Sequence, residues 1–344
     1  MSTSAKLIRR GVVILADMDK FHGKERLKAL ENRCHFAYIE PTSREDIISR
    51  LRELGAERPY EAMIFFPGFW LFKVWDKDIF GPFIGSLKLV ITPSAGYDHV
   101  DVDYLTRNGV YLANSPVAVA EPTAMTTLML ILQTVRATTR AEMTLRRGNW
   151  RAGLEFTDDI RDMTIGIIGN GHIGQLVQKK LQGLGVGKVI YNNRHRLPPS
   201  AENGAIYKSI NELLAESDLV TLHCPYTPET RHLLSEGQFA LMKKGSYVVN
   251  TSRGPVVDEE ALVRAMKSGQ IAGVGLDVYE NEPDVHPYLM QSERATLFPH
   301  WGSSVKRALR DVDLECLGNL EDWLETGVPT SPVNKPATKS ENQN

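Results

Sequence analysis

The segment from Thr164 to Gly174, TIGIIGNGHIG, constrains the fold more than any other part of the chain. It reads as an apolar strand that turns through Gly169-x-Gly171-x-x-Gly174 and continues into a helix, QLVQKKLQGLG. In such a turn the first glycine permits the bend, the second lets the backbone approach a pyrophosphate, and the third allows close helix packing. The unpaired amides at the start of the helix then bind phosphate oxygens. A second apolar strand, VIYNN, follows where the motif requires it, so we predict a dinucleotide site rather than an ordinary turn.

Short apolar runs alternate with helical patterns on both sides of this motif. The runs before residue 115 are VVILAD, CHFAYIE, AMIFFP, LKLVITP and GVYLAN, and those after it are MTIGIIG, KVIYNN, LVTLHC, SYVVNTS and AGVGLDV. Strands that are apolar at nearly every position are typical of parallel sheets covered by helices on both faces. The sequence therefore predicts an α/β protein with two Rossmann-like domains.

The bulk composition excludes several kinds of protein. The length of 344 residues allows roughly two domains. Forty Lys and Arg against 42 Asp and Glu give a net charge of -2, which does not support nucleic-acid binding as the main activity. Cys34, Cys224 and Cys316 are too widely spaced for a disulfide framework or a metal site. Because no apolar stretch is long enough for a membrane span and Asp17 interrupts the first apolar run, we expect a cytoplasmic protein without a membrane or metal partner.

A long apolar segment separates the two groups of strands. From about Val119 to Arg147, Met, Leu and Ile recur at helical spacing, which predicts a long helical segment that is either buried or a subunit interface. The end of the chain after about residue 330 is rich in Pro, Thr, Ser, Lys and Asn, and we expect it to fray because it has little to bury.

Three polar residues follow apolar strands in the second half, where open α/β sheets bind ligands. Arg253 closes VVNTSRGP, Glu282 follows GLDVYEN, and His300 lies in LFPHWGSS. Taken singly, such an Arg is more often a surface ion pair and such a His a structural residue. Together they suit hydride transfer to a 2-oxo acid. The Arg fork matches a planar keto-carboxylate, the His can donate a proton to the carbonyl oxygen, and the carboxylate orients the imidazole and favours its charged form.

On these segments the chain resembles the D-isomer-specific 2-hydroxyacid dehydrogenase family, and the resemblance covers nearly the whole chain. GIIGNGHIG is similar to the family's cofactor turn, and LHCPYTPETRHLL to the strand and loop that follow it. NTSRGPVVDEEAL, GLDVYENEP and FPHWGS resemble the segments that hold its catalytic Arg, Glu and His. The 18-residue step from Glu282 to His300 also agrees with the family. The most similar members are fungal glyoxylate and hydroxypyruvate reductases and D-mandelate dehydrogenases.

The resemblance implies a discontinuous architecture. Residues 1–114 and 306–344 would form a flavodoxin-like substrate-binding domain, with residues 115–305 inserted as the NAD(P)-binding Rossmann domain. A segment of about 119–150 would be a dimerisation arm, so a homodimer is expected. Trp150 would then reach toward the substrate in the partner's active site.

The resemblance also assigns roles to individual residues. Arg253 would hold the substrate carboxylate and carbonyl, His300 would be the acid/base, and Glu282 its partner. Backbone amides at Ala95 and Gly96, in SAGYDH, would bind the substrate carboxylate. Asp277 would contact the nicotinamide carboxamide, and the cofactor-binding set as a whole would be Gly169, Gly171, His172, Ile173, Gly174, Asn193, Arg194, His195, Cys224, Pro225, Thr230, Thr251, Asp277 and Gly302.

The stretch VIYNNRHR, residues 189–196, predicts the preferred cofactor. An acid at the end of this strand would bind both ribose hydroxyls of NADH and repel the 2'-phosphate of NADPH. Asn193 occupies that position, so the repulsion is absent, and Arg194 can fork onto the phosphate. His195 and Arg196 add positive potential. A solvated basic turn is the alternative, but NADPH-preferring members of the family often carry an Arg here, and we predict NADPH.

The sequence does not decide which 2-oxo acid is the substrate. The aromatic loop FFPGFW, Phe65 to Trp70, would favour a small acid such as glyoxylate or hydroxypyruvate if its rings fill the pocket. If they line a larger pocket, it would favour mandelate- or phenylpyruvate-type acids. Phe69 and Trp70 could also merely pack between domains.

Two other activities are compatible with a related fold. Formate dehydrogenases carry Gln where this chain has Glu282, which argues against that reaction. Transcriptional corepressors of the same family bind dinucleotide and act mainly as interaction proteins, but this chain lacks the long disordered extension expected of such a regulator. Steady turnover of a 2-oxo acid would separate the enzyme from the corepressor.

Overall fold

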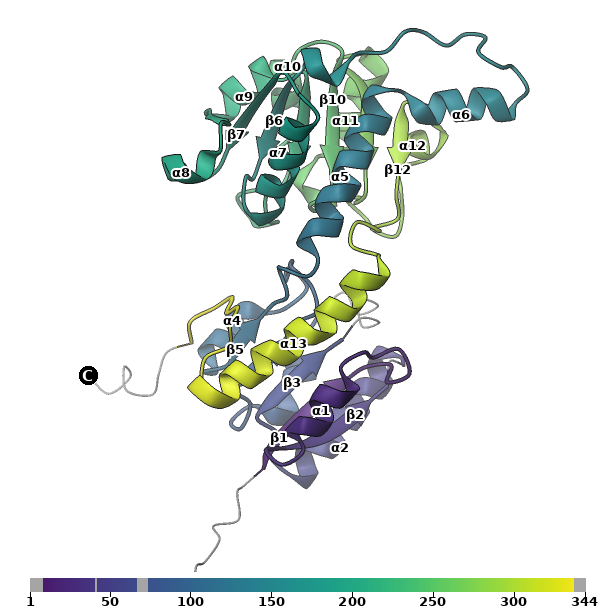
Figure 1. The fold of residues 1–344 in the computed structure, drawn as a ribbon. Coiled ribbons are helices and arrows are strands. Elements are labelled where there is room, and N and C mark those ends of the chain that lie inside the picture. Colours follow the sequence, from purple (N-terminus) through teal and green to yellow (C-terminus); the bar gives the residue numbers. More distant parts are fainter. Residues whose placement is uncertain (1–8, 41, 67–73, 337–344) are drawn as a thin grey trace, which may run out of the picture. The chain divides into compact units, whose positions relative to one another are not determined.

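The computed structural model of the chain describes residues 9–40, 42–66 and 74–336. It divides into two compact units, one formed by residues up to 119 with those from 305 onward, the other by residues 120–304. Along the chain, the second unit is therefore inserted within the first (Figure 1).

The first unit is built on a five-stranded parallel sheet in the order β2-β1-β3-β4-β5, the flavodoxin-like order. Its strands are β1 (Arg10–Leu15), β2 (Cys34–Ile39), β3 (Ala62–Phe65), β4 (Leu89–Ile91) and β5 (Tyr111–Ala113). Its helices are α1 (Lys24–Leu30), α2 (Arg44–Glu57), α3 (Lys77–Phe80), η2 (Gly81–Phe83), α4 (Val102–Arg107) and α13 (Lys306–Thr326). Each of the five predicted runs forms a strand.

Both faces of this sheet are buried, as the apolar runs predict. Successive residues of β1 point to opposite faces, so Val13 joins the core that contains Leu51 of α2. Val12 joins the core that contains Leu317 of α13. The prediction of a parallel sheet covered on both faces is confirmed for this unit.

The chain after α13 stays attached to the edge of the sheet. Pro332 forms an antiparallel bridge with Ala113, and the Val333 amide donates to the Leu112 carbonyl at 2.7 Å. The side-chain oxygen of Asn334 accepts from the Leu112 amide at 2.7 Å. The expectation that the chain frays after about residue 330 is therefore wrong for residues 331–334, because hydrogen bonds to β5 and the packing of Val333 against the core hold them in place.

The second unit contains a seven-stranded parallel sheet in the order β12-β11-β10-β9-β6-β7-β8. Its strands are β6 (Thr164–Ile168), β7 (Lys188–Asn192), β8 (Ile206–Tyr207), β9 (Leu219–Leu222), β10 (Ser246–Asn250), β11 (Ile271–Leu276) and β12 (Ala295–Leu297). The order reverses between β6 and β9, which is the Rossmann arrangement, and ligands bind beyond the carboxyl ends of the strands at such a point. Strands β8 and β12 were not predicted, because β8 has only two residues and Thr296 interrupts the short apolar run of β12.

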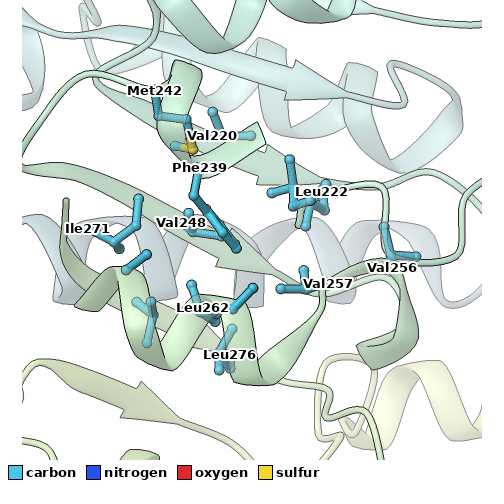
Figure 2. Close-up of a cluster of buried hydrophobic side chains, with 14 of the residues drawn as sticks. Val220, Leu222, Phe239, Met242, Val248, Val256, Val257, Leu262, Ile271 and Leu276 are labelled. Atoms are coloured by element: carbon cyan, nitrogen blue, oxygen red, sulfur yellow. The ribbon is translucent and has the colours of Figure 1, made fainter. Parts of the chain in front are cut away.

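Helices cover both faces of this second sheet. They are α5 (Ala120–Val135), α6 (Thr138–Arg146), η3 (Ile160–Asp162), α7 (His172–Gly183), α8 (Pro199–Glu202), α9 (Ile210–Glu216), α10 (Glu236–Leu241), η4 (Gly254–Val256), α11 (Glu259–Ser268) and α12 (Pro287–Gln291). Figure 2 shows the core in which Val220 of β9 and Val248 of β10 meet Leu262 of α11. On the opposite face, Leu130 of α5 and Val177 of α7 belong to the core that contains Ile165 and Ile167 of β6.

The apolar segment after residue 119 is two helices rather than the one predicted. Ala137, between α5 and α6, has a left-handed φ of 46°, which a right-handed helix cannot continue. Helix α5 lies directly on the sheet, since a Cβ on Gly275 of β11 would come within 2.6 Å of the Thr134 hydroxyl. Burial on this sheet accounts for much of its apolar character, although Met125 and Met129 are 53% and 43% exposed. In the described part of the chain, no helix combines the length and hydropathy needed to cross a membrane.

Candidate active site

The glycine-rich turn lies where β6 and β9 meet. Gly169 has a φ of 93°, and a Cβ there would come within 2.4 Å of the Cys224 amide in the segment after β9. A Cβ on Gly174 would come within 2.4 Å of the Gly169 carbonyl. Both positions therefore exclude a side chain. Gly171 differs, because its Cβ would meet no described atom within 4 Å, so the backbone there faces open space.

Helix α7 begins immediately after Gly171, with His172 and Ile173 in its first turn. The N-cap Gly171 supplies no side-chain hydrogen bond, and the first turn contains no acidic residue. The amides at this helix end therefore lack a side-chain cap and are positioned for an anion. His172 is exposed and Ile173 is half-buried.

Other predicted cofactor residues already hold parts of the chain together. The Thr230 hydroxyl donates to the Pro225 carbonyl at 2.7 Å and accepts from the Thr227 amide at 2.8 Å, which closes the loop after β9. The Thr251 hydroxyl lies 2.8 Å from that of Thr127, so α5 is tied to the end of β10. Cys224 is buried with a free thiol. These contacts describe the walls of the predicted cofactor site.

The predicted cofactor-specificity residues in the segment after β7 form two groups: some contact other parts of the chain, and the others are exposed. The Asn193 side chain accepts from the Asn170 amide at 2.6 Å, so it is joined to the glycine-rich turn. Arg194 and His195 are exposed. Arg196 instead forms an ion pair with Glu202 at 2.8 Å. The positive potential predicted for Arg196 is therefore largely neutralised by its partner.

Arg253 is positioned by the end of β10 and by a close backbone approach. The side chain of Asn250, 1% exposed, donates to the Arg253 carbonyl at 2.9 Å and accepts from the Ser252 amide at 3.0 Å. The next residue, Gly254, lies against the segment that follows β11, because a Cβ on it would come within 1.8 Å of the Tyr279 carbonyl. This approach brings the Arg253 loop next to the segment that carries Glu282.

His300 is held in an unusual backbone conformation by Asp277. Its φ is 53°, a left-handed value that costs a non-glycine residue free energy. The His300 amide donates to the Asp277 carbonyl at 2.8 Å, and the Asp277 carboxylate accepts from the amides of Trp301 and Gly302 at 2.6 and 2.8 Å. Burial raises the pKa of Asp277, although these two amides stabilise its charge. Three hydrogen bonds to one residue thus fix the His300 loop.

Glu282 and His300 form the central contact of the site. His300 Nδ1 lies 2.8 Å from Glu282 Oε2, and Glu282 Oε1 accepts from the Tyr279 amide at 3.0 Å. Burial alone would raise the pKa of Glu282, but the hydrogen bond and charge of His300, together with smaller effects of the Tyr279 amide and of Arg253, outweigh it, and the net pKa is lowered. The imidazole is 48% exposed. One imidazole nitrogen is therefore held by a carboxylate, which leaves Nε2 for a reacting group.

Two groups of predicted substrate residues lie apart from this contact in the sequence. Ala95 and Gly96 follow β4 in the first unit, where Ser94 Oγ donates to the Gly96 carbonyl at 2.6 Å. Trp150 follows α6 in the second unit and is 74% exposed.

Of the aromatic loop Phe65 to Trp70, only the first two residues lie in the described chain. Phe65 stacks on Trp75 at 3.7 Å between ring centroids, and Phe66 packs against Phe21 at 4.5 Å. These two rings are core residues rather than pocket walls. Phe69 and Trp70 lie outside the described residues.

Sequence reasoning did not single out Asn250, Gly254 or the anchoring contacts of Asp277. Each follows a general signal. A buried Asn that ends an apolar strand needs partners for its amide, and a Gly directly after a candidate catalytic residue marks a close backbone approach. The partners themselves join segments too distant in sequence for spacing to reveal.

Comparison with known proteins places this geometry in context. The family described as D-isomer specific 2-hydroxyacid dehydrogenase, NAD binding domain, matches residues 128–302, which contain Arg253, Glu282 and His300. A Schizosaccharomyces pombe protein named as a 2-hydroxyacid dehydrogenase is 39% identical over 319 residues, covering 90% of this chain and 92% of that protein.

Three solved structures resemble the whole chain. A glyoxylate reductase from Paecilomyes thermophila has a TM-score of 0.87 and 33% identity, covering 94% of this chain and 98% of its own. The holo form of Rhodotorula graminis D-mandelate dehydrogenase has a TM-score of 0.88 and 31% identity, with coverages of 96% and 99%. An NADPH-dependent glyoxylate/hydroxypyruvate reductase from Sinorhizobium meliloti, in complex with NADP and malonate, has a TM-score of 0.78 and 26% identity, with coverages of 95% and 97%.

Proposed function

Because this chain belongs to the D-isomer specific 2-hydroxyacid dehydrogenase family, an NAD(P)-dependent oxidoreductase family, we propose that it reduces a small 2-oxo acid with NADPH. Glyoxylate and hydroxypyruvate are the substrates we favour. The observation that carries the proposal is the 2.8 Å contact of His300 with Glu282, next to the Arg253 loop.

The residues of the site divide the reduction between them. The nicotinamide cofactor, when bound, supplies a hydride to the carbonyl carbon of the acid. Arg253 offers a planar guanidinium to the carboxylate and the carbonyl oxygen. His300 donates its Nε2 proton to that oxygen as negative charge develops there, and Glu282 stabilises the protonated imidazole from the other side. In the oxidation of the 2-hydroxy acid the same nitrogen accepts the proton.

The cofactor would lie on the second unit, at the uncapped start of α7. The open space at Gly171 and the amides of His172 and Ile173 suit a pyrophosphate. The NADPH preference rests on Asn193, which replaces the acid expected after β7, and on the exposed guanidinium of Arg194. The resemblance to an NADPH-dependent reductase solved with NADP supports this assignment.

The second candidate is a reductase of bulkier 2-oxo acids. It is favoured by the likeness to D-mandelate dehydrogenase, whose TM-score of 0.88 is close to that of the glyoxylate reductase. The burial of Phe65 and Phe66 removes two of the rings that could fill or line a pocket, so these residues favour neither acid.

We also propose a homodimer formed through the segment of about 119–150. Figure 1 shows that α6 and the chain after it project from the rest of the second unit. Leu145 and Trp150 are 55% and 74% exposed there, and a partner subunit that covered them would remove this apolar surface from water. Light scattering at micromolar concentration tests this, since a stable monomer would contradict it.

A panel of kcat/KM values tests the activity. It would compare glyoxylate, hydroxypyruvate, phenylpyruvate and benzoylformate, each with NADPH and NADH. We expect the highest value with glyoxylate or hydroxypyruvate and NADPH. A higher value with the two aryl acids would establish the second candidate, and dinucleotide binding without turnover of any acid would favour a corepressor.

A further inference from the structure

The loop that carries Arg194, residues 193–198, is fixed at its first end to the glycine-rich turn. The Asn193 side chain accepts from the Asn170 amide at 2.6 Å and donates to the Asn170 carbonyl at 3.4 Å. On the preceding strand, the Asn192 carbonyl accepts from the Gly169 amide at 2.9 Å. The start of the loop therefore keeps a constant position relative to the predicted pyrophosphate site.

The far end of the loop is fixed by Glu202, at the end of α8. Its Oε1 accepts from Arg196 Nε at 2.8 Å and from the Tyr191 hydroxyl at 2.7 Å, while Oε2 accepts from Arg196 at 3.2 Å. The Tyr191 hydroxyl in turn accepts from the Leu197 amide at 3.1 Å. Arg196 and then Tyr191 lower the pKa of Glu202, so the carboxylate is ionised throughout the neutral range. The far end of the loop is thus held both by the hydrogen bonds of Glu202 and by its negative charge.

A buried amide connects the two ends. Gln178 of α7, 1% exposed, accepts from Asn170 Nδ2 at 2.8 Å and donates to the Glu202 carbonyl at 2.7 Å. It also lies 3.1 Å from the Asn203 carbonyl. The glycine-rich turn and the end of α8 are therefore parts of one hydrogen-bonded frame, with the Arg194 loop spanning it.

Between these anchors the cations of the loop differ in availability. In the described part of the chain, Arg194 and His195 are exposed and neither forms a hydrogen bond or an ion pair, although the charge of Arg194 adds to the hydrogen bond of Thr227 in lowering the pKa of Glu229. Arg196 is occupied, and its withdrawal would leave Glu202, whose side chain is only 14% exposed, without its cationic partner. Leaving a mostly buried carboxylate unpaired is costly, which keeps Arg196 on Glu202.

We propose that Glu202 is a positioning residue for cofactor selection: it clamps Arg196 against α8 and so presents Arg194 as the cation for the 2'-phosphate of NADPH. This inference rests on the proposed NADPH preference. Glu202 would act without touching the cofactor, through the geometry of the loop. Its effect should therefore appear in the recognition of the phosphate and not in the chemistry.

The main test compares both cofactors in wild type and Glu202→Gln. Loosening one anchor of the loop should raise KM for NADPH and Kd for NADP about fivefold, which is less than the loss of a whole charged hydrogen bond because Arg194 itself is retained. KM for NADH, Kd for NAD and kcat should change by less than about twofold, because they do not depend on Arg194. Glu216→Gln is the matched control, since Glu216 also pairs with cations, Lys188 and Lys208, but lies outside the loop.

A double-mutant cycle that combines Glu202→Gln with Arg196→Gln tests whether Arg196 only holds the loop or itself binds the 2'-phosphate. If Arg196 only holds the loop, Arg196→Gln and the double variant should resemble Glu202→Gln, because all three break the same pair. A fall in KM for NADPH in Glu202→Gln, or a further loss in the double variant, would show that Arg196 binds the phosphate and would overturn the proposal. Equal loss with both cofactors would also overturn it, because it would mean a purely structural role.

The same measurements keep this proposal distinct from the proposed function. A wild-type enzyme without NADPH preference refutes the cofactor assignment, and the Glu202 inference with it. A wild-type preference that Arg194→Gln removes but Glu202→Gln leaves intact refutes the inference alone. Turnover with NADH shows in every case that the variant is folded.

Discussion

The two ends of the predicted cofactor site are built differently. At the catalytic end, His300 and Arg253 are held by Asp277 and Asn250, two polar residues that are 2% and 1% exposed. At the adenosine end, the cations lie on an exposed loop. The outer anchor of this loop is the ion pair between Glu202 and Arg196, and the Arg196 side chain is 62% exposed. A buried anchor admits few substitutions because any unpaired polar atom is costly, whereas Arg194 and His195, exposed between the anchors of their loop, can be replaced without leaving a buried partner unpaired. In our proposal the chemistry therefore lies on the rigid part, and the choice of cofactor on the exposed loop.

This comparison predicts which kinetic constant each substitution changes. Changes at the catalytic end should lower turnover with NADPH and NADH alike. Changes in the loop after β7 should alter the ratio of the two cofactors and leave turnover intact. The two ends would be coupled if a substitution at the catalytic end changed the ratio of the two cofactors, or if one in the loop after β7 lowered turnover.

His300→Asn should have the largest effect. Losing the proton donor should lower kcat by about 10²–10⁴-fold with either cofactor, because general acid catalysis contributes that much. Binding of NADP, measured by calorimetry, should be unchanged. If kcat stayed within about tenfold of wild type, another group would be the acid.

Arg253→Lys should come next. An ammonium keeps the charge but cannot form the two parallel hydrogen bonds of the guanidinium, so kcat/KM should fall by about a hundredfold. The loss should appear in both kcat and KM for the 2-oxo acid and be the same for both cofactors. A variant with nearly wild-type kcat/KM would remove Arg253 from the site.

Arg194→Ala should affect the other side of the comparison. It should raise KM for NADPH by about 10- to 100-fold and leave KM for NADH and kcat nearly unchanged, since a charged hydrogen bond to phosphate is lost. Asn193→Asp should shift the preference toward NADH, because a carboxylate repels the 2'-phosphate. Equal use of both cofactors by wild type would refute the assignment.

The same division explains how far the sequence could be interpreted. The ten strands were predictable because buried parallel strands are apolar along their whole length, and the three catalytic candidates because polar residues end such strands. The break at Ala137 was not, since its left-handed φ leaves no mark in an otherwise helical pattern. The pairing of Arg196 with Glu202 was not predictable either, because charge alone does not reveal which of several neighbouring cations has a partner.

The smallest expected effect is on the pH dependence in Glu282→Gln. Burial raises the pKa of Glu282, but the hydrogen bond and charge of His300 lower the net value, so the carboxylate is ionised in the neutral range and places a negative charge beside the imidazole. Reduction of a 2-oxo acid consumes a proton, so its rate falls as the pH rises. Glutamine can still accept from Nδ1 but carries no charge, so the falling limb of kcat/KM should move to lower pH, by about one unit or less for a half-exposed pair. Glu280→Gln is the control, because Glu280 pairs with His232 at 2.6 Å in the same segment and should leave the limb in place. If the limb were unchanged in Glu282→Gln, some other group would control it, and the carboxylate would serve only to orient the ring.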